Sequence, residues 1–279
     1  MKIVDKKILS QTKDTKIVKF IISAALIAQK VQAGQFVVLM VNELGERIPL
    51  TVVDRDRKKG TITLISQEVG LTTRLLGRLN IGNSLFALAG PLGHPTEIRD
   101  YGKVIVVGGG VGIAEIYPVA KALKQAKNYI QAILGARTKQ LLILEKELKE
   151  VSDQLHICTD DGSSGKKGFT TDILKELLND SCGSTAYELV YAVGPIPMMR
   201  RVSDITKEFN IKTIVSLNAL MVDATGMCGC CRVAVDNKTK FTCIDGPEFD
   251  AHLVDWDELE KRTKVYDAKE KGICKLFRI

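Results

Sequence analysis

Residues 103–123, KVIVVGGGVGIAEIYPVAKAL, begin with an apolar run, continue through a group of glycines and end in apolar residues at helical spacing. This pattern predicts a buried strand, a tight turn and a helix. Glycines at such a turn let the backbone approach a pyrophosphate, whose charge the N-terminus of the following helix stabilises. The candidate nucleotide loop consists of Gly108, Gly109, Gly110, Val111 and Gly112.

The glycine loop departs from the usual dinucleotide-binding fingerprint. Ile113 occupies the third glycine position, and no acidic residue follows at the distance expected for binding a ribose. A tight turn without a ligand is therefore an alternative. Two later segments favour the nucleotide: CTDDGS at 158–163 and AVGPIP at 192–197 both end apolar strands at the carboxyl edge, where open sheets bind ligands. Their candidate residues are Asp160, Asp161, Gly194 and Pro195.

Strand-like and helical segments alternate from about residue 101 to residue 216. Such alternation is typical of a parallel sheet with helices on both faces. Arg137 follows the strand-like segment YIQAILGA. An arginine at this place can bind the 2′-phosphate of a nucleotide, although it can equally be an ordinary surface residue.

The first hundred residues contain short segments rich in Val, Ile, Thr and Phe, which glycine, asparagine and charged turns separate. They predict a small antiparallel β-barrel with one helix, GLTTRLLGRL at 70–79. The basic run DRDRKK at 54–59 lies between two such segments and is expected to form a hairpin turn. We expect three domains, at residues 1–98, 99–216 and 217–279.

Composition excludes several classes of protein. The chain has 279 residues, 45% hydrophobic residues, 5% aromatic residues and a net charge of +7. Scattered lysines and few aromatic residues argue against nucleic-acid binding. The N-terminus has no apolar signal-peptide core, and the longest apolar run, FIISAALIA, is too short to span a bilayer. We therefore expect a soluble cytoplasmic protein with no nucleic-acid or membrane partner.

Four of the seven cysteines lie between Cys228 and Cys243. Cysteines this dense in a cytoplasmic chain favour a metal site over disulfides. Plant-type iron–sulfur ligation uses the spacing C-x4-C-x2-C with a distant fourth ligand. Cys228 and Cys231 supply the second and third positions, Cys243 follows them, and the first position falls on Asp223. Cys230 competes with Asp223, and zinc competes with iron, although a second C-x2-C pair is missing.

Two segments of the first domain suggest a phosphate-bearing ligand there. ERIPLTVVD places Arg47, Pro49 and Thr51 on one short strand. An arginine can bind a pyrophosphate through two hydrogen bonds, and a threonine can hydrogen-bond a ring nitrogen, but both are also common on surfaces. Gly70 and Thr72 open the expected helix and make a second N-terminus suited to phosphate.

Together these motifs resemble the ferredoxin–NADP reductase superfamily. Within it, the chain is similar to electron-transfer subunits of dihydroorotate dehydrogenase, and more closely to small subunits of NADH-dependent ferredoxin:NADP oxidoreductase. The similarity extends along the chain through AGQFVVL, GVGIAEIYPVAKAL, TDDGSSGKKGFTTD, VGPIPMMRRV and CIDGPEFDAHLVDW. Ala25 is a departure, because relatives often have proline there, in a segment expected to be a strand.

The resemblance implies FAD in the barrel and NAD(H) in the second domain. Arg47 would meet the FAD pyrophosphate, and Thr51 would lie beside the central-ring nitrogen that exchanges hydride. The remaining FAD residues implied by the resemblance are Pro49, Leu50, Leu64, Ile65, Ser66, Gly70, Thr72 and Thr73.

The resemblance also implies a 2Fe–2S cluster. Its ligands would be Asp223, Cys228, Cys231 and Cys243, because the closer family carries aspartate where dihydroorotate dehydrogenase subunits have cysteine. The implied activity is that of an NAD(P)H–flavin oxidoreductase subunit. It would exchange single electrons with a larger flavoprotein subunit and, through it, with ferredoxin by electron bifurcation. Two alternatives are a dihydroorotate dehydrogenase electron-transfer subunit and a zinc-stabilised nucleotide-binding protein with no redox role.

Overall fold

A computed structural model of the chain describes residues 1–180, 186–266, 269 and 272. The chain forms two compact units. Unit 1 comprises Met1–Pro95, Asn218–Pro247 and Asp255–Ile279, and unit 2 comprises Thr96–Leu217 and Glu248–Val254. Cys182 and Cys274 lie outside the described residues.

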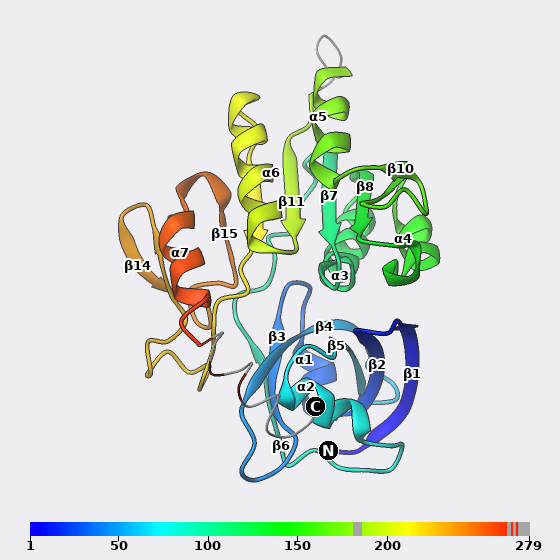
Figure 1. Cartoon of the computed structure of the whole chain (residues 1–279), viewed down its shortest axis with the longest axis vertical. Helices are drawn as coiled ribbons and strands as arrows, with labels where there is room; N and C mark the ends of the chain where they lie inside the picture. The colour runs from blue at the N-terminus through cyan, green and yellow to red at the C-terminus, as the bar shows by residue number, and fades with distance from the viewer. Residues whose placement is uncertain (181–185, 267–268, 270–271, 273–279) are drawn as a thin grey trace. The chain divides into compact units, whose positions relative to one another are not determined.

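Unit 1 contains a six-stranded antiparallel sheet in the order β1-β2-β5-β4-β3-β6 (Figure 1). Its strands are β1 (Ile3–Gln11), β2 (Lys16–Ser23), β3 (Phe36–Met40), β4 (Ile48–Asp56), β5 (Thr61–Gln67) and β6 (Ala87–Leu92). Lys2 bridges Ser84, and the N–H of Ile3 donates to the carbonyl of Asn83 at 2.9 Å, so the start of β1 meets the segment before β6. The sheet therefore curls towards closure, as the predicted barrel requires.

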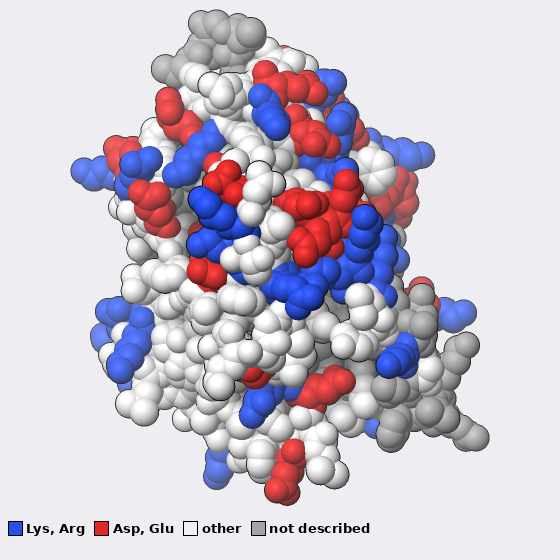
Figure 2. Space-filling view, turned by 90° about the vertical axis from the view of Figure 1, so that its left-hand side faces the viewer, with Lys and Arg blue, Asp and Glu red and all other residues white. Residues whose placement is uncertain are grey.

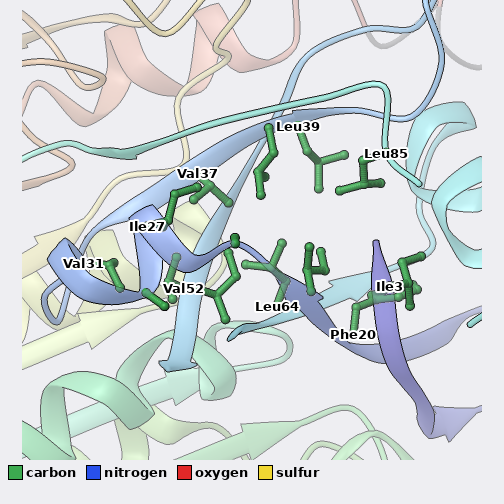
Figure 3. Close-up of a cluster of buried hydrophobic side chains, with 14 of the residues drawn as sticks. Ile3, Phe20, Ile27, Val31, Val37, Leu39, Val52, Leu64 and Leu85 are labelled. Atoms are coloured by element: carbon green, nitrogen blue, oxygen red, sulfur yellow. The ribbon is translucent and has the colours of Figure 1, made fainter. Parts of the chain in front are cut away.

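Apolar side chains from the strands fill the interior of this sheet. Phe20, Leu39 and Leu64 are among the buried residues of one cluster, to which α1 (Ala25–Lys30) also contributes (Figure 3). The β4–β5 turn follows Asp56 and ends at Gly60, whose φ of +65° suits glycine. The basic run at 54–59 thus forms the end of β4 and the hairpin turn, as expected.

Ala25 begins helix α1, so the expectation of a strand there was wrong. β2 ends at Ser23, and the N–H of Ala24 donates to the carbonyl of Gly60, after which the chain turns into the helix. Ala, Leu, Gln and Lys favour helix, and Ile27 and Ala28 face the core. The expected helix at 70–79 is confirmed as α2 (Leu71–Arg78).

Unit 2 contains a seven-stranded sheet in the order β10-β9-β8-β7-β11-β12-β15 (Figure 1). Its parallel strands are β7 (Lys103–Gly109), β8 (Tyr129–Ala136), β9 (Gln154–Thr159), β10 (Lys166–Lys167), β11 (Leu189–Val193) and β12 (Thr213–Ser216). Helices α3 (Gly112–Gln125) and α4 (Glu145–Val151) pack together, as do α5 (Thr170–Asp180) and α6 (Ile196–Glu208). Val104–Val107 of β7 are fully buried, which explains the unbroken apolar run.

The C-terminal part of the chain contributes elements to both units. In unit 1 it forms the hairpin of β13 (Arg232–Val235) and β14 (Lys238–Phe241), and helix α7 (Trp256–Thr263). In unit 2 it supplies β15 (Glu248–Asp250), which pairs antiparallel with β12, and the short turn η2 (Ala251–Leu253). The predicted three-domain division stays a prediction, but residues 248–254 fall in unit 2 and not with the rest of the C-terminal part.

Charged residues of both signs occur on the face shown in Figure 2, where Lys and Arg lie interspersed with Asp and Glu. None of the helices in the described part of the chain is long and apolar enough to span a membrane.

Candidate functional site

The carboxyl edge of the unit 2 sheet gathers the predicted nucleotide residues. Strands β9, β8, β7 and β11 are consecutive neighbours and parallel. Their ends are followed, in that order, by Asp160 and Asp161, by Arg137, by the glycine loop, and by Gly194 and Pro195. The structure therefore brings these residues into one row at the edge where parallel sheets bind ligands.

The glycines of the loop are glycines for different reasons. A Cβ on Gly112 would lie 2.4 Å from the carbonyl oxygen of Val193, and one on Gly108 would lie 2.9 Å from the Cα of Ile113. The close packing of α3 on the sheet therefore requires glycine at these two positions. Gly110 differs, because its φ is +58° and nothing lies within 4 Å of its Cβ position. Among the glycines of this loop, Gly110 is therefore the one that leaves space for a ligand next to the N-terminus of α3.

Met198, at the start of α6, lies over the same edge. Its Sδ would be 2.4 Å from a Cβ on Gly109, and its Cε would be 2.7 Å from one on Gly194. The Cα of Gly109 is also only 3.2 Å from the Cβ position of Gly194. Close packing therefore joins the glycine loop to the predicted Gly194–Pro195 segment.

Arg137, Asp160 and Asp161 are exposed at the other end of the row. The N–H of Asp161 donates to the carbonyl of Arg137 at 3.3 Å. The Asp161 carboxylate accepts from the Ser163 hydroxyl at 2.6 Å and from its N–H at 2.9 Å, and these hydrogen bonds lower the pKa of Asp161. The backbone hydrogen bond thus places residue 161 next to residue 137 at this end of the row.

Thr138 was not predicted as a site residue. Its hydroxyl oxygen is buried next to Arg137 and has no hydrogen-bond partner in the described part of the chain. A buried hydroxyl without a partner is costly unless a ligand satisfies it. Because Thr138 directly follows the predicted residue Arg137, the sequence could have suggested it as a site residue.

In unit 1, six of the predicted FAD residues fall on two neighbouring strands, β4 and β5. β4 lies between β3 and β5, Thr51 pairs with Phe36, and Val52 pairs with Leu64. In this antiparallel register, the residues before Val52 and those after Leu64 lie at the same end of the strand pair. The segments Pro49–Leu50–Thr51 and Leu64–Ile65–Ser66 are thus brought together.

The start of α2 lies beside the start of β4. Gly70 is the N-cap of α2, and the Thr73 hydroxyl accepts from the N–H groups of Val69 and Gly70 at 3.0 and 3.1 Å. The Thr72 hydroxyl donates to Oε2 of Glu46 at 2.9 Å. Because Glu46 precedes Arg47 in the chain, this contact connects the two segments predicted to bind the FAD pyrophosphate. Glu46 itself was not predicted.

The β13–β14 hairpin brings two of the predicted metal ligands together. Cys231 precedes β13 and Cys243 follows β14, and the N–H of Thr242 donates to the carbonyl of Cys231 at 3.1 Å. Their Sγ atoms are 3.3 Å apart, both residues are buried, and neither forms a disulfide. Burial and the contact with Cys231 raise the pKa of Cys243 to about 12.

The other two predicted ligands lie in the loop before the hairpin. The Asp223 carboxylate accepts from the N–H groups of Thr225 at 2.8 Å and Cys228 at 3.1 Å, and Cys228 is exposed. The Cys230 thiol contacts the carbonyl of Cys228 at 4.0 Å. Among the described residues, no group of three or more His, Cys, Asp and Glu side chains is placed to hold a metal ion. The four-ligand set therefore stays a prediction.

Both cofactor sites nevertheless fit the groups expected in them. In unit 1, the Ser66 hydroxyl is buried without a hydrogen-bond partner among the described residues, within the segment predicted to border the flavin. Next to the cysteine pair, Thr242 is fully buried, and its hydroxyl likewise lacks a partner there. Two buried free thiols in contact are a donor set suited to soft metal ions such as iron in a cluster.

Two family models match parts of the chain. Residues 106–204 match the family model of the oxidoreductase NAD-binding domain. Residues 218–255 match the iron–sulfur cluster binding domain of dihydroorotate dehydrogenase B. Fold and sites thus define an iron–sulfur oxidoreductase with an NAD-binding domain and a ferredoxin-reductase-like fold. The chain belongs to the family of dihydroorotate dehydrogenase B electron-transfer subunits and their homologues.

The relatives support this assignment over nearly the whole chain. An electron-transfer subunit homolog of dihydroorotate dehydrogenase B from Thermotoga maritima is 48% identical over 252 residues, which are 90% of this chain and 88% of that protein. The electron-transfer subunit from Geobacillus sp. is 31% identical and covers 84% of this chain and 91% of its own length. The resemblance inferred from the sequence is confirmed.

Solved structures show the same fold. The structure of an NADH-dependent reduced ferredoxin–NADP oxidoreductase, described in connection with flavin-based electron bifurcation, matches with a TM-score of 0.90. It is 44% identical and covers 100% of this chain and 98% of its own. A ferredoxin–NADP+ reductase from Plasmodium falciparum, 17% identical with a TM-score of 0.59, covers 74% of this chain and 88% of its own and shares the fold. This fold implies FAD binding, and the chain is an electron-transfer subunit with NAD-binding and iron–sulfur domains.

Proposed function

We propose that the chain passes electrons between NAD(H) and a larger flavoprotein subunit, as part of an NADH-dependent reduced ferredoxin:NADP oxidoreductase that works by electron bifurcation. The observation that carries this proposal is the end-to-end match, at 44% identity, to the solved structure of that enzyme. Aspartate at position 223, at the first position of the iron–sulfur spacing, supports the same choice.

When bound, FAD would exchange hydride with the nicotinamide and single electrons with a 2Fe–2S cluster. The N-terminus of α3 and the open space at Gly110 would receive the NAD(H) pyrophosphate. Arg47 would neutralise the FAD pyrophosphate, and the Thr51 hydroxyl would hydrogen-bond the flavin ring. Asp223, Cys228, Cys231 and Cys243 would hold the cluster.

NADH is the proposed nucleotide of this subunit. Asp160 and Asp161 follow β9 directly beside Arg137, so a 2′-phosphate at this edge would meet carboxylates as well as the arginine. Like charges in close proximity oppose binding. Stopped-flow reduction of the flavin by NADH and by NADPH compares the two nucleotides directly, and faster reduction by NADPH would overturn this choice.

A second function is favoured by the names of the relatives. Several are electron-transfer subunits of dihydroorotate dehydrogenase B, and the iron–sulfur family model takes its name from that enzyme. In that case the electrons would come from dihydroorotate oxidised by a partner subunit. The two functions share the cofactors of this chain and differ in the partner.

The experiment that separates them uses the native complex, isolated anaerobically through a tag on this chain. We expect the complex to reduce ferredoxin with NADPH in a reaction that depends on NAD+, and not to reduce NAD+ with dihydroorotate. NAD+ reduction by dihydroorotate, without the NADPH-dependent reaction, would establish the second function. A complex without flavin or iron would rule out both.

A further inference from the structure

The loop between β3 and β4 ends in Glu46 and Arg47, and only Arg47 has a part in the function proposed above. Glu46 Oε2 accepts a hydrogen bond of 2.9 Å from the hydroxyl of Thr72, which lies 26 residues further along the chain. Glu46 is an exposed residue, whereas Thr72 is buried in the first turn of α2. The contact thus joins the end of a loop to the start of a helix.

The direction of the Thr72 hydroxyl distinguishes it from its neighbour. Thr73 caps its own helix, since its hydroxyl bonds the backbone of Val69 and Gly70. Thr72 instead donates away from the helix, to a carboxylate. Hydrogen bonds with one ionised partner are roughly twice as strong as neutral ones.

A carboxylate near a pyrophosphate site has two opposite effects. Its charge repels the diphosphate, but Glu46 is exposed, so solvent and salt screen that repulsion. Its hydrogen bond to the buried Thr72 joins residue 46, and with it the backbone leading into Arg47, to the first turn of α2. Less conformational entropy is lost when a ligand binds to two groups that are already held in place than when it binds to two mobile groups. We expect the positional effect to outweigh the screened repulsion.

We propose that Glu46 is a positioning residue of the FAD site: through Thr72 it holds Arg47 and the first turn of α2 in the arrangement that receives the FAD pyrophosphate. This inference rests on the proposed function only in taking Arg47 and α2 as the pyrophosphate-binding elements. It assigns to Glu46 an effect on FAD affinity and none on the NAD-binding unit.

The test measures FAD binding to the full-length protein after the flavin has been removed. Glu46→Ala should raise the dissociation constant of FAD about tenfold, because it removes the charge-assisted hydrogen bond to Thr72. Thr72→Val removes the same bond together with any contact of the hydroxyl to phosphate, so it should weaken FAD binding at least as much. The double variant should bind no more weakly than Thr72→Val alone, since Glu46 acts only through Thr72. Thr72→Ser, which keeps the hydroxyl, should restore most of the affinity.

Controls separate this role from a general effect on folding or charge. Glu43→Gln removes a carboxylate from the same exposed loop and should leave FAD affinity unchanged. NADH affinity, measured by fluorescence quenching, should stay constant in all variants. If Glu46→Ala does not fold, a double-mutant cycle of Glu46→Gln and Thr72→Val measures the coupling energy between the two residues instead.

Three results would overturn the proposal. Unchanged FAD affinity in Glu46→Ala would show that the contact is incidental, and tighter binding would show that Glu46 is a competing anion. Strictly additive losses in the double variant would show that the two residues act separately. Failure of the premise looks different: a wild-type protein that lacks FAD altogether would show that Arg47 and α2 do not bind its pyrophosphate, whereas a different partner enzyme would leave FAD in place.

Discussion

At the scale of single residues, Arg47 carries most of the proposed FAD affinity. It is exposed immediately before β4, next to the Glu46–Thr72 contact. Arg47→Ala should weaken FAD binding by about 10- to 100-fold, because a hydrogen bond to a charged group contributes about 1.5–3 kcal/mol. The flavin-to-protein ratio after gel filtration measures this. Arg57→Ala, an exposed arginine in the β4–β5 turn, is the matched control. Full flavin occupancy in Arg47→Ala would show that Arg47 does not belong to the FAD site.

The fourth cluster ligand is the second question at this scale. With Asp223 as ligand, one iron has a hard oxygen donor in place of a soft thiolate, and cluster potential depends on ligand type and charge. Asp223→Cys should therefore keep a 2Fe–2S cluster while its midpoint potential and EPR g-values shift. Cys230→Ser should leave both nearly unchanged. If Cys230→Ser destroys the cluster and Asp223→Ala spares it, Cys230 is the ligand.

Residue type and spacing together allow a chemical role to be predicted from sequence, although the role of each site residue stays a prediction. Cys231 and Cys243 were grouped by spacing, and the structure places their sulfur atoms 3.3 Å apart. The Glu46–Thr72 contact could not be predicted in this way. A hydrogen bond between residues 26 positions apart depends on how α2 packs beside β4, and neither segment shows that alone.

At the scale of elements, the position of α3 depends on Gly112. A Cβ there would lie 2.4 Å from the Val193 carbonyl, so Gly112→Ala must push α3 away from β11. Overpacking of this kind costs about 1–3 kcal/mol or more, and we expect a lower urea midpoint together with weaker NADH binding. Gly102→Ala is the control: its φ is +81° but its Cβ position is open, so it should leave NADH affinity unchanged. A Gly112→Ala variant with unchanged stability and NADH affinity would contradict this packing.

Glu248 connects β15 to the centre of the unit 2 sheet. Its Oε1 accepts from the Tyr191 hydroxyl at 2.8 Å and from the Thr96 hydroxyl at 2.5 Å, and burial raises its pKa above the ordinary 4.5. The folded state therefore holds this proton more tightly than the unfolded state does. The stabilisation is complete below the ordinary pKa and is lost as pH rises through the raised one.

Glu248→Gln removes this dependence, since the amide stays neutral. The stability of the wild type relative to Glu248→Gln should therefore fall as the pH is raised from about 4 to about 8. Urea unfolding of both proteins across that range gives the difference. A difference that does not change with pH would show that Glu248 keeps its ordinary pKa.

Most elements of unit 2 were predictable because strands buried on both faces alternate with amphipathic helices. Elements whose signal is weaker were missed. β1 (Ile3–Gln11) mixes exposed Val4 and Ile8 with charged residues, so its pattern does not alternate cleanly. β15 has only three residues, and its place depends on pairing with β12 rather than on its own sequence.

At the scale of the whole molecule, the functional account rests on the order of the parts along the chain. The antiparallel sheet predicted to hold FAD comes first, the NAD-binding sheet second and the cysteine hairpin third, and the hairpin falls in the same compact unit as the antiparallel sheet. The class of protein was predictable because each part has its own motif. The partner subunit was not, because the motifs of this chain serve its own cofactors.

The central claim is that this one chain converts hydride from NADH into single electrons at an iron–sulfur cluster. Freeze-quench EPR of the anaerobically purified chain, mixed with NADH, tests it most directly. The account predicts flavin bleaching followed by the signal of a reduced 2Fe–2S cluster, and in Cys243→Ser the bleaching without that signal. If NADH bleaches the flavin but no iron–sulfur signal follows, although dithionite produces one, the chain does not transfer electrons from flavin to cluster and the account is wrong.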